Sequence, residues 1–185
     1  MSRAGHVSNR RSAQAEKDDF YTTDPKAVEL LLQKEVFCKF IMEPACGQGH
    51  IAKVLEDHGH VVICTDLIDR GFGLPGIDFL KAPLSHWYGD IVTNPPYKLA
   101  KEFVEKSFQI ISDGHKVAMF LKLTFLEGQS RRELFIRHPP KTVYVSSARL
   151  ECGKNGVFTG SSAVAYCWIV WEKGHTGETR LAWIN

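Results

Sequence analysis

The residues with the clearest chemistry are Asn94 to Tyr97, which read Asn-Pro-Pro-Tyr and directly follow a hydrophobic run at residues 91–93. Neither proline has an N–H, and Pro96 pushes Pro95 into an extended conformation. The amide oxygen of Asn94 and the carbonyl oxygen of Pro95 are therefore expected to face outward as two acceptors. A planar amino group with two N–H bonds would match this pair, and the ring of Tyr97 could stack on the base that carries it.

This pair of acceptors predicts a specific reaction. An aromatic exocyclic amine is a poor nucleophile because its lone pair is delocalised into the ring. Accepting from both N–H bonds localises the lone pair toward an incoming methyl group, which stabilises the transition state electrostatically. We therefore expect Asn94, Pro95, Pro96 and Tyr97 to catalyse methylation of a flat nitrogen without a strong general base. The alternative, a turn that ends a strand, leaves the asparagine and the tyrosine unexplained.

A second set of residues is typical of an adenosine pocket. The loop E-P-A-C-G-Q-G at residues 43–49 has two glycines that let the backbone approach a ligand. Asp66 lies 19 residues beyond Gly47, which is the spacing of a carboxylate that accepts from ribose hydroxyls. Asp78 could accept from an adenine amino group, with Phe79 packed beside the base. Each of these residues taken alone could instead be a turn or cap residue.

The same loop indicates which adenosine cofactor fits. It lacks the third glycine of G-x-G-x-x-G, and Glu43 places a carboxylate where a dinucleotide would place its pyrophosphate. A carboxylate there repels phosphate and attracts a positively charged ligand. S-adenosyl-L-methionine has a sulfonium, an ammonium group and no phosphate. The sequence therefore predicts S-adenosyl-L-methionine as the cofactor.

Taken in order, these motifs resemble those of a known family. F-Y-T-T-D-P at residues 20–25, E-P-A-C-G-Q-G, D-F-L at residues 78–80 and N-P-P-Y are similar to the motif set of gamma-class DNA amino-methyltransferases, which modify adenine N6. The chain also resembles small methyltransferases of phages and prophages that lack a target-recognition domain. This second likeness extends into F-L-E-G-Q and the segment A-Y-C-W-I-V-W.

The resemblance implies a role for each matching position. The methionine part of the cofactor would contact Tyr21, Thr22 and Thr23. The ribose and methionine side would be lined by Glu43, Ala45 and Gly47, with Asp66 on the ribose hydroxyls and Asp78 and Phe79 on the adenine. Asn94, also counted among the cofactor contacts, would hold the target base together with Pro95 and Tyr97, and a base in a duplex must first be flipped out of the stack. Lys122 and Phe125 are looser candidates for the far wall.

The elements that must position these residues alternate along the chain. Helices are predicted from Pro25, capped by Asp24 or Thr23, and over residues 51–58, 99–112 and 130–136. Strands are predicted over residues 40–42, 61–65, 90–93, 117–123, 143–146, 165–171 and 181–184, with Asp78 near the end of a third strand region. The pattern predicts an α/β, doubly wound, Rossmann-like class I methyltransferase fold, with a mostly parallel sheet and antiparallel C-terminal strands. Such sheets bind ligands at the carboxyl ends of their strands.

Length and composition favour one domain. The 185 residues, 44% of them apolar, fit a methyltransferase domain at residues 19–185 behind a flexible basic tail at residues 1–18. The five cysteines are widely spaced, which fits neither a zinc site nor a disulfide framework, so no metal is expected. No apolar run approaches the ~20 residues of a membrane span. We expect a cytoplasmic protein.

Charge is distributed unevenly. Residues 19–97 hold 6 Lys/Arg and 11 Asp/Glu, whereas residues 98–154 hold 11 and 6. The acidic half suits a cationic cofactor and the basic half a polyanion. DNA is the expected partner and RNA the alternative. With no room for a separate recognition domain, contacts would come from the tail, from the loop at residues 153–162 and from the basic residues Arg131, Arg132, Arg137, Arg149 and Lys154. Sequence preference would then be short, or a specificity subunit or weak homo-oligomer would supply it.

Two other classes remain open. The Asn-Pro-Pro-aromatic device also serves enzymes that methylate RNA at guanine N2 or adenine N6, or a protein glutamine amide. Such enzymes resemble D-x-G-x-G more often than E-P-A-C-G. The second class is a binding subunit that keeps the fold without activity, which would have no use for two free acceptors.

Overall fold

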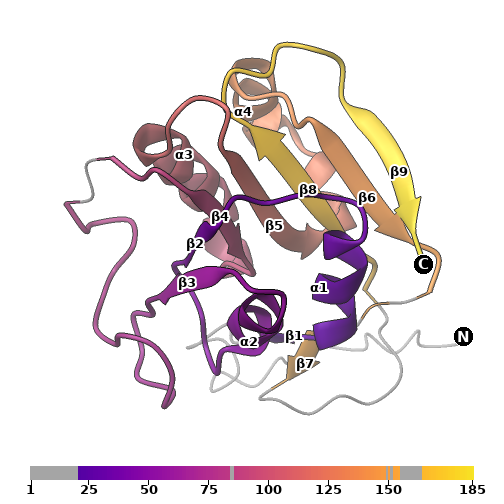
Figure 1. Cartoon of the computed structure of the whole chain (residues 1–185). Coiled ribbons are helices and arrows are strands. Elements are labelled where there is room, and N and C mark those ends of the chain that lie inside the picture. Colours follow the sequence, from indigo (N-terminus) through magenta and orange to yellow (C-terminus); the bar gives the residue numbers. More distant parts are fainter. Residues whose placement is uncertain (1–20, 84–85, 149, 151, 155–163) are drawn as a thin grey trace, which may run out of the picture.

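The computed structural model describes residues 21–83, 86–148, 150, 152–154 and 164–185. The basic tail, Arg149, most of the loop at residues 153–162 and the side chain of Lys154 lie outside these ranges, so the roles expected for them stay predictions. Two sheets form the fold (Figure 1). The larger contains β2 (Phe40–Glu43), β3 (Val61–Cys64), β4 (Asp90–Thr93), β5 (Lys116–Lys122), β6 (Thr142–Ser146), β8 (Tyr166–Glu172) and β9 (Arg180–Ile184). The smaller pairs β1 (Tyr21–Thr23) with β7 (Cys152–Lys154).

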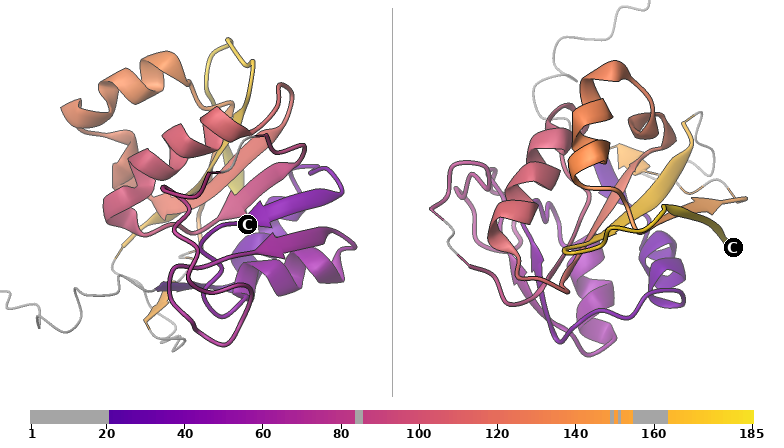
Figure 2. Two further views of the ribbon diagram at one scale, coloured as in Figure 1. Left: turned by 90° about the vertical axis from the view of Figure 1, so that its left-hand side faces the viewer. Right: turned by 90° about the horizontal axis from the view of Figure 1, so that it is seen from above.

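The seven-stranded sheet has the order β3-β2-β4-β5-β8-β6-β9. Strand β8 is antiparallel to β5 and β6, and the remaining strands run parallel to one another. Among the described residues, four α-helices cover it: α1 (Pro25–Leu32), α2 (His50–Asp57), α3 (Ala100–Ile110) and α4 (Arg132–Arg137). Figure 2 shows α1 and α2 on one face and α3 and α4 on the other. The doubly wound arrangement expected from the sequence is confirmed.

The core follows the alternation of the strands. On β5, Ala118 and Phe120 pack with the helices α1 and α2, whereas Val117, Met119 and Leu121 pack with α3. All five are essentially inaccessible to solvent. Successive side chains of a strand point to opposite faces, so a strand covered on both faces is apolar at every position. This is why the run at residues 117–121 shows no polar alternation.

The first helix begins as predicted. Asp24 accepts a hydrogen bond from the backbone N–H of Lys26 at 2.9 Å, and Pro25 occupies the first turn, where its missing N–H has no consequence. Val28 and Leu31 are fully buried. The cap therefore fixes the residue at which α1 begins. The segment that precedes α1 reaches the candidate site.

The predicted third strand region near Asp78 is wrong. Between β3 and β4 the described residues form a loop, in which Thr65 and Leu74 make an isolated bridge and Trp87 makes another with Ile111. Glycines 71, 73 and 76 all have positive φ, and residue 75 is proline, so the chain cannot keep an extended conformation there. The β1–β7 pairing was not predicted. None of the helices in the described ranges is long and apolar enough to cross a membrane.

Candidate functional site

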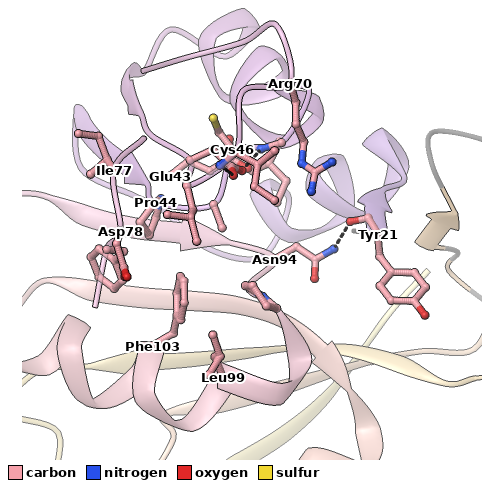
Figure 3. Close-up of a pocket in the computed structure, with 18 of the residues that line it drawn as sticks. Tyr21, Glu43, Pro44, Cys46, Arg70, Ile77, Asp78, Asn94, Leu99 and Phe103 are labelled. Carbon is pink, nitrogen blue, oxygen red and sulfur yellow. Dashed lines mark hydrogen bonds between the residues drawn. The ribbon is translucent and has the colours of Figure 1, made fainter. Parts of the chain in front are cut away.

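A cavity of about 580 Å³ lies at the carboxyl ends of β2, β3 and β4. This volume is typical of a small-molecule site. Figure 3 shows Leu99 and Phe103 at the α3 end of the cavity, facing the loop that carries Glu43 and Cys46. Most of the predicted site residues line it: Tyr21, Thr22, Thr23, Glu43, Ala45, Gly47, Asp66, Asp78, Phe79, Asn94 and Pro96. Pro95 and Tyr97 are not among the lining residues.

The glycine loop after β2 is built as the sequence predicts. Gly47 and Gly49 have φ values of 55° and 77°, in the left-handed region. A Cβ on Gly49 would lie 2.5 Å from the ring of Phe72. A larger residue at this position would therefore be strained by the left-handed backbone and would also clash with the ring. The backbone N–H of Gly47 donates to Asp66 Oδ2 at 2.8 Å. The loop is thereby fixed against the end of β3.

Glu43 is a buried carboxyl with an unsatisfied oxygen. It is 1% exposed, and its Oε2 atom has no hydrogen-bond partner. The N–H of Ala52, in the first turn of α2, donates to the carboxyl. Burial, followed by the neighbouring Cys46, raises the pKa of Glu43 well above its usual range. A positively charged group beside Oε2 would supply the missing interaction.

The other two carboxyls are held by backbone donors. Asp66 accepts from Gly47 through Oδ2 and from the N–H of Ile68 through Oδ1 at 2.9 Å. Asp78 accepts from the N–H of Leu80 at 3.0 Å and pairs with Lys81 at 3.0 Å. Each carboxylate oxygen has a second acceptor site, so both side chains can still bind a ligand hydroxyl or amine. Asp66 and Asp78 can therefore stabilise their turns and bind a ligand at the same time.

Asn94 is held in one orientation. Its Nδ2 atom donates to the Tyr21 carbonyl at 2.9 Å and to Thr23 Oγ1 at 3.0 Å (Figure 3). A carbonyl oxygen only accepts, so the nitrogen must face Tyr21 and the amide oxygen must face the other way. No donor of the described residues hydrogen-bonds the oxygens of Asn94 or Pro95. Within the part of the chain that the structure describes, the two acceptors expected from the sequence therefore meet no competing donor.

Tyr97 lies beside this pair in an aromatic cluster. Its ring stacks on Tyr21 at a centroid distance of 5.4 Å and contacts Tyr166 at 5.8 Å, with Lys122 Nζ 4.7 Å from its centroid. Its hydroxyl lies 3.0 Å from Cys152 Sγ. Burial, followed by Cys152 and Tyr166, raises the pKa of Tyr97 well above its usual range, so the phenol stays protonated. It can act as a ring surface and not as a base.

The β1–β7 pair brings distant residues to the site. The Thr22 hydroxyl donates to the Gly153 carbonyl at 2.9 Å, and Thr23 accepts from Asn94. Burial raises the pKa of Cys152 to about 11. The hydroxyls of both threonines are therefore engaged within the protein, and β1 fixes Asn94 in addition to lining the cavity.

Sequence reasoning missed several lining residues. Phe103 packs on Phe79 at a centroid distance of 5.1 Å. The cationic residues Arg70, Lys81 and Lys98 also line the cavity, and Figure 3 shows Arg70 extending toward the space beside Asn94. The helical period of α3 marks Phe103 as buried without specifying what it faces. Arg70 lies in an irregular loop, where sequence gives no side-chain direction.

Comparison with solved structures establishes the fold. A class I S-adenosylmethionine-dependent methyltransferase from Listeria monocytogenes matches 86% of this chain with a TM-score of 0.56 and 14% identity. The modification subunit of a type I restriction enzyme from Vibrio vulnificus matches 90%, with a TM-score of 0.61 and 14% identity. An RNA methyltransferase from Pyrococcus horikoshii matches 89%, with a TM-score of 0.59 and 14% identity.

The fold is that of class I S-adenosylmethionine-dependent methyltransferases. The chain spans 62% of the Listeria protein, 47% of the Vibrio subunit and 90% of the Pyrococcus protein. No family model and no curated protein matches the sequence. The Rossmann-like class I prediction is confirmed.

Of the basic residues expected to face a nucleic acid, Arg131 and Arg137 already bind other groups of the protein. Arg131 donates to the carbonyl oxygens of Phe125, Thr124 and Glu127, and Arg137 pairs with Glu105 at 2.6 Å. Arg132 is exposed. Phe125 is buried against Phe135, and neither it nor Lys122 lines the cavity, so a place for them in the far wall of a base pocket stays a prediction.

Proposed function

We propose that this chain is a methyltransferase that transfers a methyl group from S-adenosyl-L-methionine to an exocyclic amino group, namely adenine N6 in DNA. The observation that carries the proposal is the orientation of Asn94. Its amide nitrogen is bound by Tyr21 and Thr23, so its oxygen faces the other way and, among the described residues, meets no donor that would compete with a substrate amine.

The cavity fits the cofactor in chemistry and size. The unsatisfied Oε2 of Glu43 calls for a cation, and S-adenosyl-L-methionine has cationic ammonium and sulfonium groups. Asp66 would accept from the ribose hydroxyls and Asp78 from the adenine amine, with the rings of Phe79 and Phe103 on the apolar side. The cofactor supplies an electrophilic methyl group on sulfur.

The residues of the chain would act on the amine. Asn94 and Pro95 accept from its two N–H bonds, which localises the nitrogen lone pair and stabilises the positive charge that develops on nitrogen. Pro96 keeps Pro95 extended. No strong base need act first, because the amine proton becomes acidic only once methyl transfer has begun, and it then passes to solvent. The phenol of Tyr97 stays protonated and does not take it up. The ring of Tyr97, which stacks on Tyr21 and contacts Tyr166 in this structure, is the proposed stacking surface for the base.

DNA is favoured over the other polymers by the order of the motifs around this site. The likeness to the modification subunit of a type I restriction enzyme agrees with DNA and with a partner that supplies specificity. Arg132 and Lys98, both exposed, are left to contact phosphates, which position a duplex without reading its sequence. Short sequence preference follows.

The test is methyl transfer from labelled cofactor to separate pools of DNA, RNA and protein, followed by digestion of the labelled polymer and mass analysis of its nucleosides or amino acids. The expected product is N6-methyladenine from DNA. Label in RNA or in glutamine would assign the site to the other amine substrates. Cofactor binding without transfer to any pool would indicate a binding subunit and contradict the proposal.

A further inference from the structure

A second group of chemically active side chains lies at the opposite end of the sheet. Cys38 precedes β2, Asp90 begins β4 and His115 precedes β5. These strands are neighbours and run parallel, so their amino ends meet at the edge away from the cavity (Figure 1). The cysteine sulfur, a carboxylate oxygen and an imidazole nitrogen all lie within 4.8 Å of one another.

The distances match those of metal ligands. His115 Nδ1 and Asp90 Oδ1 are 3.3 Å apart. Two ligand atoms about 2.0–2.1 Å from a tetrahedral Zn²⁺ are separated by about 3.3 Å. Closing the site therefore requires only that Cys38 Sγ turn toward this pair, away from the Phe40 carbonyl to which it now donates at 2.9 Å.

Backbone amides already orient two of the ligands. Asp90 accepts from the N–H of Cys38 through Oδ2 at 2.6 Å and from the N–H of Lys116 through Oδ1 at 2.7 Å. The N–H of Asp90 points at Cys38 Sγ at 3.2 Å. A backbone donor aimed at sulfur stabilises a thiolate, and hydrogen bonds to ligand atoms of this kind hold metal ligands in place. The N–H groups of Cys38 and Lys116 already satisfy the buried carboxylate of Asp90. The imidazole and the thiol are therefore not needed as its hydrogen-bond partners, and their closeness to it calls for another explanation.

The cluster is reachable from solvent. Asp90 is buried, whereas Cys38 and His115 are half-buried. Three protein ligands on one side would leave the fourth position of a tetrahedral ion to water. Sulfur, nitrogen and oxygen together are the ligands that zinc accepts, whereas calcium and magnesium prefer oxygen alone.

We propose that Cys38, Asp90 and His115 form a binding site for a divalent transition-metal ion of the zinc type, which joins the starts of β2, β4 and β5. When the ion binds, the thiol proton passes to solvent and the single ring proton of neutral His115 is exchanged through solvent from Nδ1 to Nε2. The thiolate and Nδ1 then bond to the metal. The site is independent of the methyltransferase proposal, because it lies at the other end of the sheet.

The test uses the full chain without a histidine tag, freed of metal by a chelator and titrated with Co²⁺ as the probe. One Co²⁺ per chain should bind, with a thiolate-to-cobalt absorption band that Zn²⁺ abolishes by displacement. Cys38→Ser should remove the band, and His115→Gln should weaken binding more than about tenfold. The exposed His86→Gln variant is the matched control and should bind as the wild type does.

Thermal unfolding distinguishes a metal site from a hydrogen-bonded cluster. Zn²⁺ should raise the Tm of the wild type and of His86→Gln, and should leave the Tm of Cys38→Ser unchanged. Binding below one ion per chain, or a cobalt band that persists in Cys38→Ser, would overturn the proposal. If Cys38→Ser and His115→Gln lower the Tm relative to the wild type by the same amount with Zn²⁺ as without it, the three side chains only hydrogen-bond and do not bind a metal.

Discussion

The hydroxyl of Thr23 accepts a hydrogen bond from the side-chain amide of Asn94 at 3.0 Å. Both side chains lie at the edge of the cavity, and Thr23 is 2% exposed. The segment before α1 therefore positions the amide at the end of β4, in addition to forming a wall. This relationship separates two roles for Thr23, one in orienting Asn94 and one in binding cofactor.

We expect Thr23→Val to lower kcat about 5- to 10-fold, since the loss of one hydrogen bond of about 1 kcal/mol lets the amide rotate. Steady-state methyl transfer and cofactor titration together test this. Thr23→Ser keeps the acceptor and should retain activity. If Thr23→Val instead raises the KM for cofactor at unchanged kcat, the residue acts as a cofactor contact and does not position Asn94.

The chemistry of the amide itself is tested by two changes at Asn94. Asn94→Ala removes the acceptor and should lower kcat by about 10²–10³, the usual effect of deleting one group that stabilises transition-state charge. Asn94→Asp keeps an acceptor but cannot donate to the Tyr21 carbonyl, so its carboxylate should be repelled from the present orientation. We expect Asn94→Asp to lose most of its activity as well.

Cofactor affinity should change little in both Asn94 variants, as measured by calorimetry. Asn185→Ala, an exposed asparagine at the last residue of the chain, is the matched control and should be fully active. Loss of cofactor binding and of Tm together in Asn94→Ala would indicate that the residue supports folding, and the catalytic role would then be wrong.

Much of this site follows from local sequence. The glycines of the loop after β2, the cap of α1 by Asp24 and the buried strand at residues 117–121 each depend on neighbours a few positions away. The direction of the Asn94 amide depends on Tyr21 and Thr23, whereas the extended backbone of Pro95 follows from proline chemistry alone. These features are predictable because their physical cause lies within one turn or one strand.

Other features depend on contacts that no local pattern encodes. Strands β1 and β7 have three residues each, which is too short to show an alternating pattern. They pair Tyr21 with Lys154, which lies far away in the sequence. The loop that replaces the expected third strand region is set by its glycines, and its irregular backbone offers no period from which the direction of Arg70 could be predicted. The cluster of Cys38, Asp90 and His115 joins the starts of three separate strands, so the spacing of the cysteines along the sequence does not reveal it.

The buried carboxyl of Glu43 gives a prediction for stability. Its pKa is raised in the folded protein, so the folded state binds a proton more tightly than the unfolded chain does. This contribution to stability is fully present below the pKa of an unfolded glutamate and is lost as pH rises through the folded pKa. Glu43→Gln should therefore raise the Tm at pH 8, by roughly 2–4 °C for a change of about 1 kcal/mol in a domain of this size.

The same substitution should weaken cofactor binding, because the neutral amide cannot attract a cation. Melting curves from pH 5 to pH 8 should show the gain in Tm shrinking toward low pH. Exposed Glu56→Gln, on α2, controls for the general loss of a negative charge. A Glu43→Gln protein that is less stable at pH 8 and binds cofactor as tightly as the wild type would contradict both the burial argument and the cationic ligand.

Gly49 allows the backbone and steric contributions of the loop to be separated. Gly49 and Gly59 have similar φ values of 77° and 85°, but a Cβ at Gly59 meets nothing within 4 Å, whereas at Gly49 it would lie 2.5 Å from Phe72. Gly59→Ala should lower the free energy of unfolding by about 1–2 kcal/mol, the penalty of a left-handed alanine. Gly49→Ala should lower it by about 1–3 kcal/mol more, because the ring must move.

Denaturant unfolding of both variants and of the double variant Gly49→Ala/Phe72→Ala measures these differences. Removing the ring removes the clash, so the added alanine should be tolerated better in the Phe72→Ala background than in the wild type. The half-buried ring of Phe72 also packs near Cys46 and Cys64, so Phe72→Ala alone is the required reference. If alanine at position 49 is equally destabilising in both backgrounds, left-handed strain alone explains the glycine and the close approach of Phe72 has no energetic consequence.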